Sequence, residues 1–330
     1  MTSDEVFRIL WESGSEFVSG EDMASDLCVS RTAVWKAVKA LKERGYDIES
    51  VPNRGYRLRG TDNVLSVGGI RQFLRHRELD IEVHRTLTSS NTVLKRMAED
   101  GCAEGKVIIA LEQTAGRGRM GRSFYSPIGS GLYMSILIRP ESEVKDMAAM
   151  TAFSAVCVCQ TIEEVCGIHA CIKWVNDVMI GGKKICGILT EGAVESESGM
   201  LNYAVIGIGI NIDIPSGGFP DDIVETAGSL YRTSPGNMLS CRLAAGILDR
   251  IMDIYRLGGR KEALEEYRRR MYLTGRPINI MNGGRIRARA TAVGVADDLG
   301  LIVRYDDGSE EVLSSGEVSV RENRNCTKKR

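Results

Sequence analysis

The stretch whose residue types could do chemistry most directly is a glycine- and arginine-rich segment, GRGRMGR, over residues 116–122. Glycine lets the backbone turn at positive φ and lets its N–H groups approach a ligand closely. Arginine presents a planar fork of hydrogen-bond donors that suits carboxylates and phosphates. This combination predicts a loop that becomes ordered around an anionic ligand. A solvated or weakly RNA-binding tract has a similar composition, so other segments must decide between the two.

Three further clusters of polar and small residues accompany this loop. Residues 88–91 (TSSN) lie at an expected helix start, where donors meet the positive end of the helix dipole; a plain N-cap has the same sequence. Residues 173–191 contain KWVND and GKKICGILTE, which place Lys184 at the start of a buried strand, with a hairpin bearing an exposed lysine pair as the alternative. Residues 207–211 (GIGIN) end a strand with small residues on which a ligand can lie, or which only weaken the strand.

Common nucleotide-binding motifs are missing from the sequence. Residues 207–211 lack the third glycine of a dinucleotide fingerprint, and no GxxxxGK[ST] phosphate loop occurs anywhere. If the protein uses ATP, it therefore uses neither of the two common nucleotide-binding folds.

Composition bounds the class of protein. A chain of 330 residues exceeds the usual size of a single core, so two or three domains are expected. The net charge of −1 indicates neither a nucleic-acid coat nor a membrane protein, and no apolar run approaches the roughly 20 residues that span a bilayer. The acidic N-terminus is unlike a secretory signal, so we expect a cytoplasmic protein. Nine cysteines without a CxxC pair, and three scattered histidines, argue against zinc and for reduced core thiols.

Residues 1–62 have the pattern of a winged helix-turn-helix domain. Ser30 is the expected N-cap of the third helix, and Gly45 is its expected stop. The domain is expected to contain three helices near 7–10, 21–27 and 31–44, and a β-hairpin over 48–58.

Charge divides this domain into two halves. Residues 1–27 contain seven acidic residues and one basic residue, whereas residues 28–60 contain eight basic and three acidic residues. The third helix and the wing therefore carry the positive charge that would face DNA. The expected DNA-binding residues are Arg31, Thr32, Lys36, Lys39 and Arg54. A protein-interaction module with solvated lysines is the alternative.

The rest of the chain predicts two more domains of an α+β protein. Residues 61–68 are a plausible linker, and residues 69–272 predict a mixed, mostly antiparallel sheet with helices. Its expected helices cover 71–77, 91–100, 144–166, 239–257 and 261–271. Its expected strands cover 81–87, 107–111, 132–138, 171–174, 178–180, 185–189 and 203–208. Residues 276–322 predict five short strands in a small β-barrel, followed by a polar tail over 323–330.

Taken in order, the four clusters resemble those of the biotin–protein ligases. The matching segments are 113–121 with Ser126-Pro127, then 173–177, 184–191 and 207–211. Residues 30–36 and 55–58 resemble the bifunctional branch of this family, whose members also repress biotin genes. The resemblance extends over residues 1–322. It implies a class II synthetase-like catalytic domain and an SH3-like C-terminal barrel.

The resemblance implies an enzyme that makes biotinyl-5′-AMP from biotin and ATP, then transfers biotin to a lysine of a carboxyl-carrier domain. A carboxylate must approach a triphosphate, so arginines, a lysine and Mg²⁺ would neutralise like charges. Lys184 and Arg119 are the implied catalytic residues. The implied biotin-binding residues are Ser89, Ser90, Asn91, Gln113, Gly116, Arg117, Gly118, Arg119, Lys184 and Gly187. The implied ATP- and adenylate-binding residues are Arg119, Arg122, Asn176, Asp177 and Asn211, with Asp177 also facing Mg²⁺.

The resemblance also implies a regulatory cycle. The adenylate orders the loop, the ordered form becomes a homodimer, and the dimer presents two winged helices to operator DNA with two half-sites. Met120, Phe124 and Val175 depart from residues that are frequent in the family, and none of them removes a residue assigned to chemistry. Two alternatives stay open: a lipoate or octanoate ligase or transferase of the same fold, and a non-catalytic biotin-sensing regulator.

Overall fold

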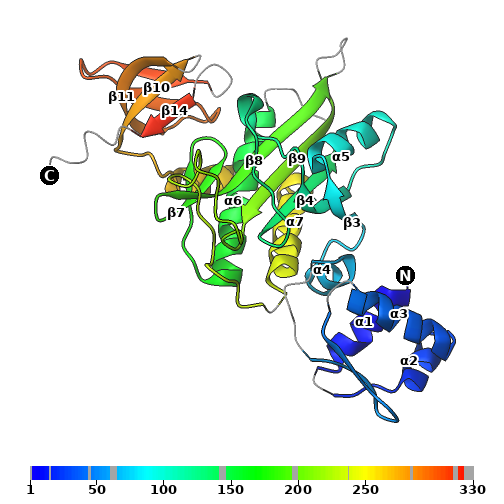
Figure 1. Cartoon of the computed structure of the whole chain (residues 1–330). Coiled ribbons are helices and arrows are strands. Elements are labelled where there is room, and N and C mark those ends of the chain that lie inside the picture. The colour runs from blue at the N-terminus through cyan, green and yellow to red at the C-terminus, as the bar shows by residue number, and fades with distance from the viewer. Residues whose placement is uncertain are drawn as a thin grey trace.

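The chain folds into three parts: an N-terminal helical module, a central seven-stranded sheet with helices, and a C-terminal five-stranded sheet (Figure 1). The computed structural model describes residues 2–14, 16–43, 46–59, 65–140, 146–194, 200–236, 238–282, 285–314 and the backbone of 319–322. Four expectations lie outside these ranges: the helix stop at Gly45, residues 61–64 of the linker, the start of the long helix at 144–145, and the polar tail.

The N-terminal module confirms the three helices and the wing. Its elements are α1 (Thr2–Glu12), α2 (Gly20–Asp26), α3 (Arg31–Glu43), β1 (Ile48–Val51) and β2 (Gly55–Leu58). The Ser30 hydroxyl accepts a hydrogen bond from the Ala33 N–H at 3.1 Å, which confirms the N-cap. The wing turns through Asn53 and Gly55, which both have positive φ. The apolar face of α3 is buried in the core of the module, so its basic residues face outward.

The segment after the wing differs from the sequence prediction. The expected helix is present, but the bounds 71–77 are wrong. Helix α4 covers Val67–Phe73 and is capped by the Ser66 hydroxyl, which accepts from the Gly69 N–H at 3.1 Å. The second half of the expected linker therefore belongs to the fold. Helix α4 lies very close to a later helix, and a Cβ on Gly69 would lie 2.5 Å from Cε of Met238.

The central sheet is mixed and mostly antiparallel, as predicted. Its strands are β3 (Asp80–Leu87), β4 (Lys106–Gln113), β5 (Gly131–Ile138), β6 (Cys171–Lys173), β7 (Asp177–Ile180), β8 (Lys183–Val194) and β9 (Leu201–Asn211). Their order is β3-β4-β5-β9-β8-β7-β6, with only the β3–β4 pair parallel among these neighbours. Strands β8 and β9 run beyond the expected ends at residues 189 and 208, because their pairing continues through polar and glycine positions.

Helices cover both faces of this sheet. Helix α5 (Ser90–Glu99) packs on the face that carries Ile108 and Leu137. The opposite face, which carries Val107 and Ile109, is covered by α6 (Asp146–Cys166), α7 (Leu239–Leu257) and α8 (Arg260–Arg269). Successive residues of a strand point to opposite faces, so both faces of a nearly continuous apolar strand are buried.

Helix α6 corrects the expectation that no apolar run is long enough to span a bilayer. Within the described ranges it is the one helix whose length and composition would allow it to cross a membrane, and 61% of its most apolar window is buried inside the fold. It is therefore well explained as the core helix between the sheet and the two later helices. Cys157 and Cys159 lie within it as free thiols, and burial raises the pKa of each to about 12. They act as small core residues, as predicted.

The C-terminal part confirms the five strands: β10 (Pro277–Asn282), β11 (Arg285–Val295), β12 (Leu301–Arg304), β13 (Glu310–Leu313) and β14 (Ser319–Glu322). They form an open antiparallel sheet with β13 and β14 at its edges. Among the described residues no pairing closes this sheet, so the expected barrel is not confirmed. The Trp174 indole N–H donates to the Leu299 carbonyl at 2.8 Å, which ties this part to the central sheet.

Candidate functional site

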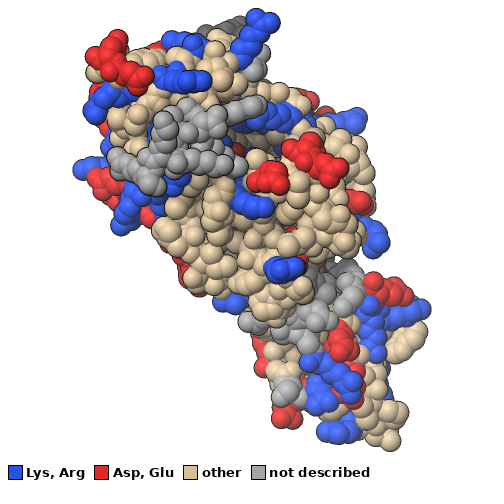
Figure 2. All heavy atoms as spheres, turned by 60° about the vertical axis from the view of Figure 1, so that its left-hand side comes forward, with Lys and Arg blue, Asp and Glu red and all other residues tan. Residues whose placement is uncertain are grey.

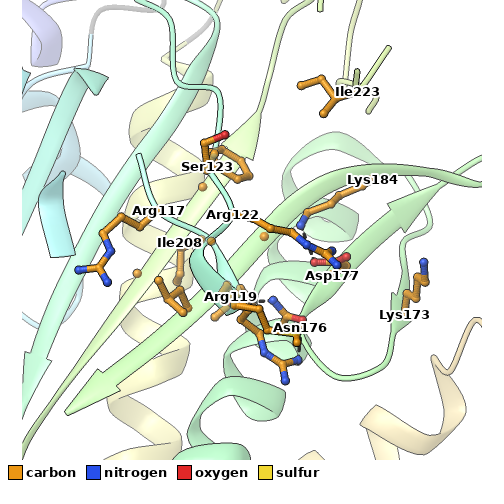
Figure 3. A pocket seen from close by; sticks show the side chains of 18 of the residues that line it. Arg117, Arg119, Arg122, Ser123, Lys173, Asn176, Asp177, Lys184, Ile208 and Ile223 are labelled. Carbon is orange, nitrogen blue, oxygen red and sulfur yellow. Dashed lines mark hydrogen bonds and ion pairs between the residues drawn. The ribbon is translucent and has the colours of Figure 1, made fainter. Parts of the chain in front are cut away.

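A cavity of about 620 Å³ lies on the central sheet and is lined by parts of all four sequence clusters (Figure 3). The expected site residues that line it are Ser89, Ser90, Asn91, Gln113, Arg117, Gly118, Arg119, Arg122, Asn176, Asp177, Lys184 and Gly187. They come from the start of α5, the loop between β4 and β5, the β6–β7 turn and strand β8. Segments that are far apart in the sequence thus converge on one space.

Two expected site residues, Gly116 and Asn211, lie outside the lining. Gly116 is buried, and a Cβ at this position would lie 2.4 Å from the Phe124 carbonyl oxygen. The glycine therefore allows two segments of the loop to pack closely against each other. The Asn211 amide donates to the Gly228 carbonyl at 2.9 Å and fastens the connection that follows β9. Both residues shape the cavity walls and do not face its interior.

Sequence reasoning missed the cavity wall formed by Asp222, Ile223 and Thr226. These residues carry no motif. They lie in the connection between β9 and α7, which runs from residue 212 to residue 238. Connections longer than about 15 residues are often functional, and this length was the available signal.

Uncharged donors and acceptors gather at the start of α5. The Gln113 side-chain oxygen accepts from the Ser90 N–H at 2.8 Å and from its hydroxyl at 3.1 Å, while the Gln113 amide donates to the Ser126 hydroxyl at 3.0 Å. Ser89 occupies the N-cap position, yet its side chain makes no capping hydrogen bond. Ser89 is therefore the N-cap by position, as the alternative expects, but its side chain is not used as a cap, and the residue lines the cavity.

Asn91 is held in a slot that exists because residue 207 is glycine. Its amide donates to the Leu189 carbonyl at 3.1 Å, and its carbonyl oxygen lies 2.6 Å from the Ser135 hydroxyl. A Cβ on Gly207 would lie 2.1 Å from that carbonyl oxygen. The glycines of β9 therefore leave room for polar side chains over the strand.

Charged groups gather in another part of the cavity (Figure 3). The Lys184 ammonium nitrogen lies 2.6 Å from a carboxylate oxygen of Asp177, and Arg119 donates to the Asn176 side-chain oxygen at 3.2 Å. Burial lowers the pKa of Arg119 and the charge of Asp177 opposes this shift. The lining holds more cations than carboxylates: Arg117, Arg119, Arg122, Lys173 and Lys184 against Asp177 and Asp222. Such an excess of positive charge favours an anionic ligand.

The Phe124 ring covers the middle of the site. It lies over two strand glycines, because a Cβ on Gly209 would lie 2.5 Å from the ring and one on Gly187 would lie 3.2 Å from it. The Lys184 ammonium lies 6.0 Å from the ring centre. The Phe124 ring therefore occupies a space that exists because residues 187 and 209 have no side chains. We call this space the Phe124 socket.

The expected DNA-binding residues Arg31, Thr32, Lys36 and Lys39 are exposed on α3. Arg54 lies at the wing, where its guanidinium stacks 4.3 Å from the centre of the Phe17 ring. Figure 2 shows basic and acidic side chains close together on this module, at the bottom of the view. Sequence reasoning missed Trp35, whose side chain is 53% exposed beside Lys39 on the outward face of α3.

Three family models match the chain. The Biotin/lipoate A/B protein ligase family matches residues 83–211, an HTH domain matches residues 3–57, and the Biotin protein ligase C terminal domain matches residues 274–321. Together they cover the three parts of the fold and contain most of the residues that line the cavity.

Similar proteins extend over nearly the whole chain. It is 33% identical over 329 residues to the bifunctional ligase/repressor BirA of Bacillus subtilis, which covers 94% of this chain and 96% of the relative. It is 27% identical over 317 residues to BirA of Escherichia coli, covering 94% of each chain. The solved biotin protein ligase from Aquifex aeolicus in complex with biotin and ATP superposes with a TM-score of 0.59 at 25% identity, covering 74% of this chain and 99% of that chain. The chain therefore belongs to the biotin–protein ligase family, in its bifunctional ligase/repressor branch.

Proposed function

We propose that the chain joins biotin to ATP, forming biotinyl-5′-AMP and pyrophosphate, and then passes the biotinyl group to a lysine amine of a carboxyl-carrier domain with release of AMP. The observation that carries this proposal is the cavity, which combines uncharged donors at the start of α5 with an excess of cations near Lys184. Biotin itself combines a neutral head with a carboxylate, and ATP adds further negative charge. The two parts of the cavity match these two chemistries.

The cavity residues divide between the two substrates. We assign Ser89, Ser90, Asn91 and Gln113 to the neutral head of biotin, with Gly116, Arg117, Gly118 and Gly187 shaping the wall around it. We assign Lys184 and Arg119 to the carboxylate and the phosphate that reacts with it, as the catalytic residues. We assign Arg122, Asn176 and Asp177 to the nucleotide side, and Asn211 to the support of the wall behind it through its hydrogen bond to Gly228. Cations that meet charge developing in the transition state lower the barrier to the reaction.

Mg²⁺ fits this site only together with the phosphates of ATP. Within the described ranges, no group of three His, Cys, Asp or Glu side chains is arranged to hold a metal ion. Asp177 lines the cavity, but its carboxylate already lies 2.6 Å from Lys184. Mg²⁺ commonly uses one or two carboxylates plus substrate phosphates, so Asp177 is the residue that would hold it. When bound, the ion neutralises phosphate charge.

The adenylation step is tested by mass spectrometry of the pure protein mixed with ATP, Mg²⁺ and one of three acids: biotin, octanoate or lipoate. We expect biotinyl-AMP in the biotin tube. An adenylate formed only from octanoate or lipoate would instead support the alternative ligase of the same fold. The absence of any adenylate would contradict the proposed enzyme and leave a biotin-sensing regulator.

We also propose that the chain is a cytoplasmic, biotin-responsive repressor. Residues 1–62 would bind operator DNA, residues 69–272 would hold biotin and ATP, and residues 276–322 would complete the enzyme as an SH3-like domain. Biotinyl-AMP would further stabilise the closed, ordered form of the loop over residues 116–122 and promote a homodimer that binds two half-sites. A ligand shifts such an equilibrium only through its different affinities for the two states.

The outward face of α3 predicts that Trp35→Ala weakens DNA binding without affecting adenylation. An exposed indole on a recognition helix has no packing role to explain it, and aromatic or apolar side chains contact thymine methyl groups in the major groove. We expect about a 10-fold weaker affinity for duplexes selected from a random library by the wild-type protein with biotin and ATP. Trp11→Phe is the control for loss of an indole away from α3, because Trp11 lies on α1 and packs against Phe7 and Phe73. Unchanged DNA affinity in Trp35→Ala would contradict this role.

The slot beside β9 predicts that Gly207→Ala weakens biotin binding. The added methyl group would displace Asn91 from its network, and overpacking of this kind costs about 1–3 kcal/mol. We expect the KM for biotin in adenylate formation to rise roughly 10-fold, with the KM for ATP changed much less. Gly217→Ala is the control, since a Cβ there meets no atom within 4 Å. Equal KM values for biotin in the two variants would show that the slot is not part of the biotin site.

A further inference from the structure

Glu191 has a set of contacts that the proposed catalytic residues do not explain. It lies on β8, outside the cavity lining, and its side chain is only 15% exposed. Its carboxylate accepts from the Asn91 amide at 3.0 Å and lies 3.3 Å from the Lys95 ammonium and 3.4 Å from the Arg117 guanidinium. One partly buried carboxylate on β8 thus contacts helix α5 and the glycine- and arginine-rich loop.

Arg117 takes a different direction from the other arginines of its loop. Figure 3 shows Arg119 and Arg122 on the side of Asn176 and Asp177, whereas Arg117 points away from them. The Arg117 side chain is half exposed, and its guanidinium pairs with the Glu191 carboxylate. Its guanidinium is therefore placed to hold the loop to the body of the protein, while the other two arginines face the charged part of the cavity.

We propose that Glu191 is a positioning residue whose carboxylate holds Arg117 and, through it, keeps residues 116–122 closed over the cavity. The proposal deepens the proposed function and rests on it only where it concerns biotin. Because the same carboxylate also fixes Asn91, Glu191 joins the loop to the wall assigned to the biotin head. Movement of the loop and the order of that wall are thereby coupled.

The ion pair with Arg117 requires a negative charge at position 191. A glutamine at 191 can still accept the hydrogen bond from Asn91, but it removes the attraction to Arg117. A partly exposed ion pair is worth up to about 1 kcal/mol, which corresponds to roughly a 2- to 5-fold change in the population of the open loop. We therefore expect a small increase in loop opening that is confined to residues near 116–122.

The test is hydrogen–deuterium exchange of the backbone over residues 114–125 in the ligand-free, full-length protein. We expect Glu191→Gln and Arg117→Gln each to raise the exchange rate roughly 2- to 5-fold, and the double variant to raise it no further, because both changes remove the same pair. Lys95→Gln is the matched control, since it removes the other cation near Glu191 and leaves the pair with the loop intact. It should leave exchange of the loop unchanged.

Three results would overturn the proposal: unchanged exchange in Glu191→Gln, an equal rise in Lys95→Gln, or additive effects in the double variant. Glu191→Asp, which keeps the charge, should lie closer to the wild type than Glu191→Gln does. A second readout is the rate at which bound biotinyl-AMP leaves, which Glu191→Gln should raise by the same factor. If the wild type makes no biotinyl-AMP, the proposed function fails while the exchange experiment still decides the role of Glu191.

Discussion

Replacing Lys184 by alanine is expected to lower the rate of biotinyl-AMP formation by about 10²–10³-fold, the usual size for loss of a group that meets charge in the transition state. The ammonium group lies in the cavity 2.6 Å from Asp177. Its removal takes away a cation and also leaves the Asp177 carboxylate facing anionic substrates. Single-turnover formation of biotinyl-AMP at saturating biotin and ATP measures this loss directly.

The neighbouring lysine provides the control. Lys183 is exposed, its ammonium donates to the Val224 carbonyl at 3.3 Å, and it does not line the cavity. The backbone of Lys184 fastens the connection after β9 by accepting from the Gly228 N–H and donating to the Thr226 carbonyl, and alanine keeps both bonds. A loss below 10-fold in Lys184→Ala, or an equal loss in Lys183→Ala, would contradict the catalytic assignment.

Replacing Arg270 by methionine is expected to destabilise the central part of the fold by about 3 kcal/mol, because it removes the buried cation that pairs with both Glu163 and Glu266. The Arg270 side chain is 8% exposed. It donates to both carboxylate oxygens of Glu163 at 2.6 and 2.7 Å, to Glu266 at 2.5 Å and to the Ala170 carbonyl at 3.1 Å. This clamp joins the end of α8 to α6 and to the start of β6.

The effect of Arg270→Met should depend on pH. Hydrogen bonds from Arg270 lower the pKa of Glu163 to about 2 from its ordinary value of 4.5. Stability that arises from a lowered carboxyl pKa is fully present above pH 4.5 and is lost as the pH falls through 2. The difference in urea unfolding between Arg270→Met and wild type should therefore be smaller at pH 3 than at pH 7. Arg269→Met removes only the exposed cation at Glu266 and leaves Arg270 in place, so it should change stability by less than about 1 kcal/mol at either pH. An effect of Arg270→Met independent of pH would contradict the clamp.

Local patterns in the sequence were sufficient to predict most of the elements and most of the cavity lining. Glycines in the loop and in β9 mark places where another part of the protein approaches the backbone closely. Gly207 and Gly209 could therefore be predicted as such places before Asn91 and Phe124 were known to be their neighbours. The Ser30 cap and the apolar face of α3 are likewise local. These features depend on residues only a few positions apart.

The features that could not be predicted depend on distant partners. Helix α4 begins at Val67 because Ser66 caps it and because Gly69 allows close packing against the start of α7, while Gly68 faces Asp4 of α1. The direction of Arg117 is set by Glu191 across the fold, and the wall at residues 222–226 is held by the backbone of Lys184. Asn211 looked like a ligand-facing residue because it ends a glycine-rich strand, yet its amide is used to hold Gly228.

The Phe124 socket defines one seated position of the loop, with the ring on the strand backbone at Gly187 and Gly209. The ring fits where two strand glycines offer no side chains, and packed interfaces of this kind are bistable and not continuously deformable. A partly inserted Phe124 ring would lose its van der Waals contacts with the strands, yet it would still keep water away from the strand backbone. We therefore expect the loop of each molecule to be either seated or released, with few molecules in between. A graded response to a ligand would then reflect the fraction of molecules whose loop is seated.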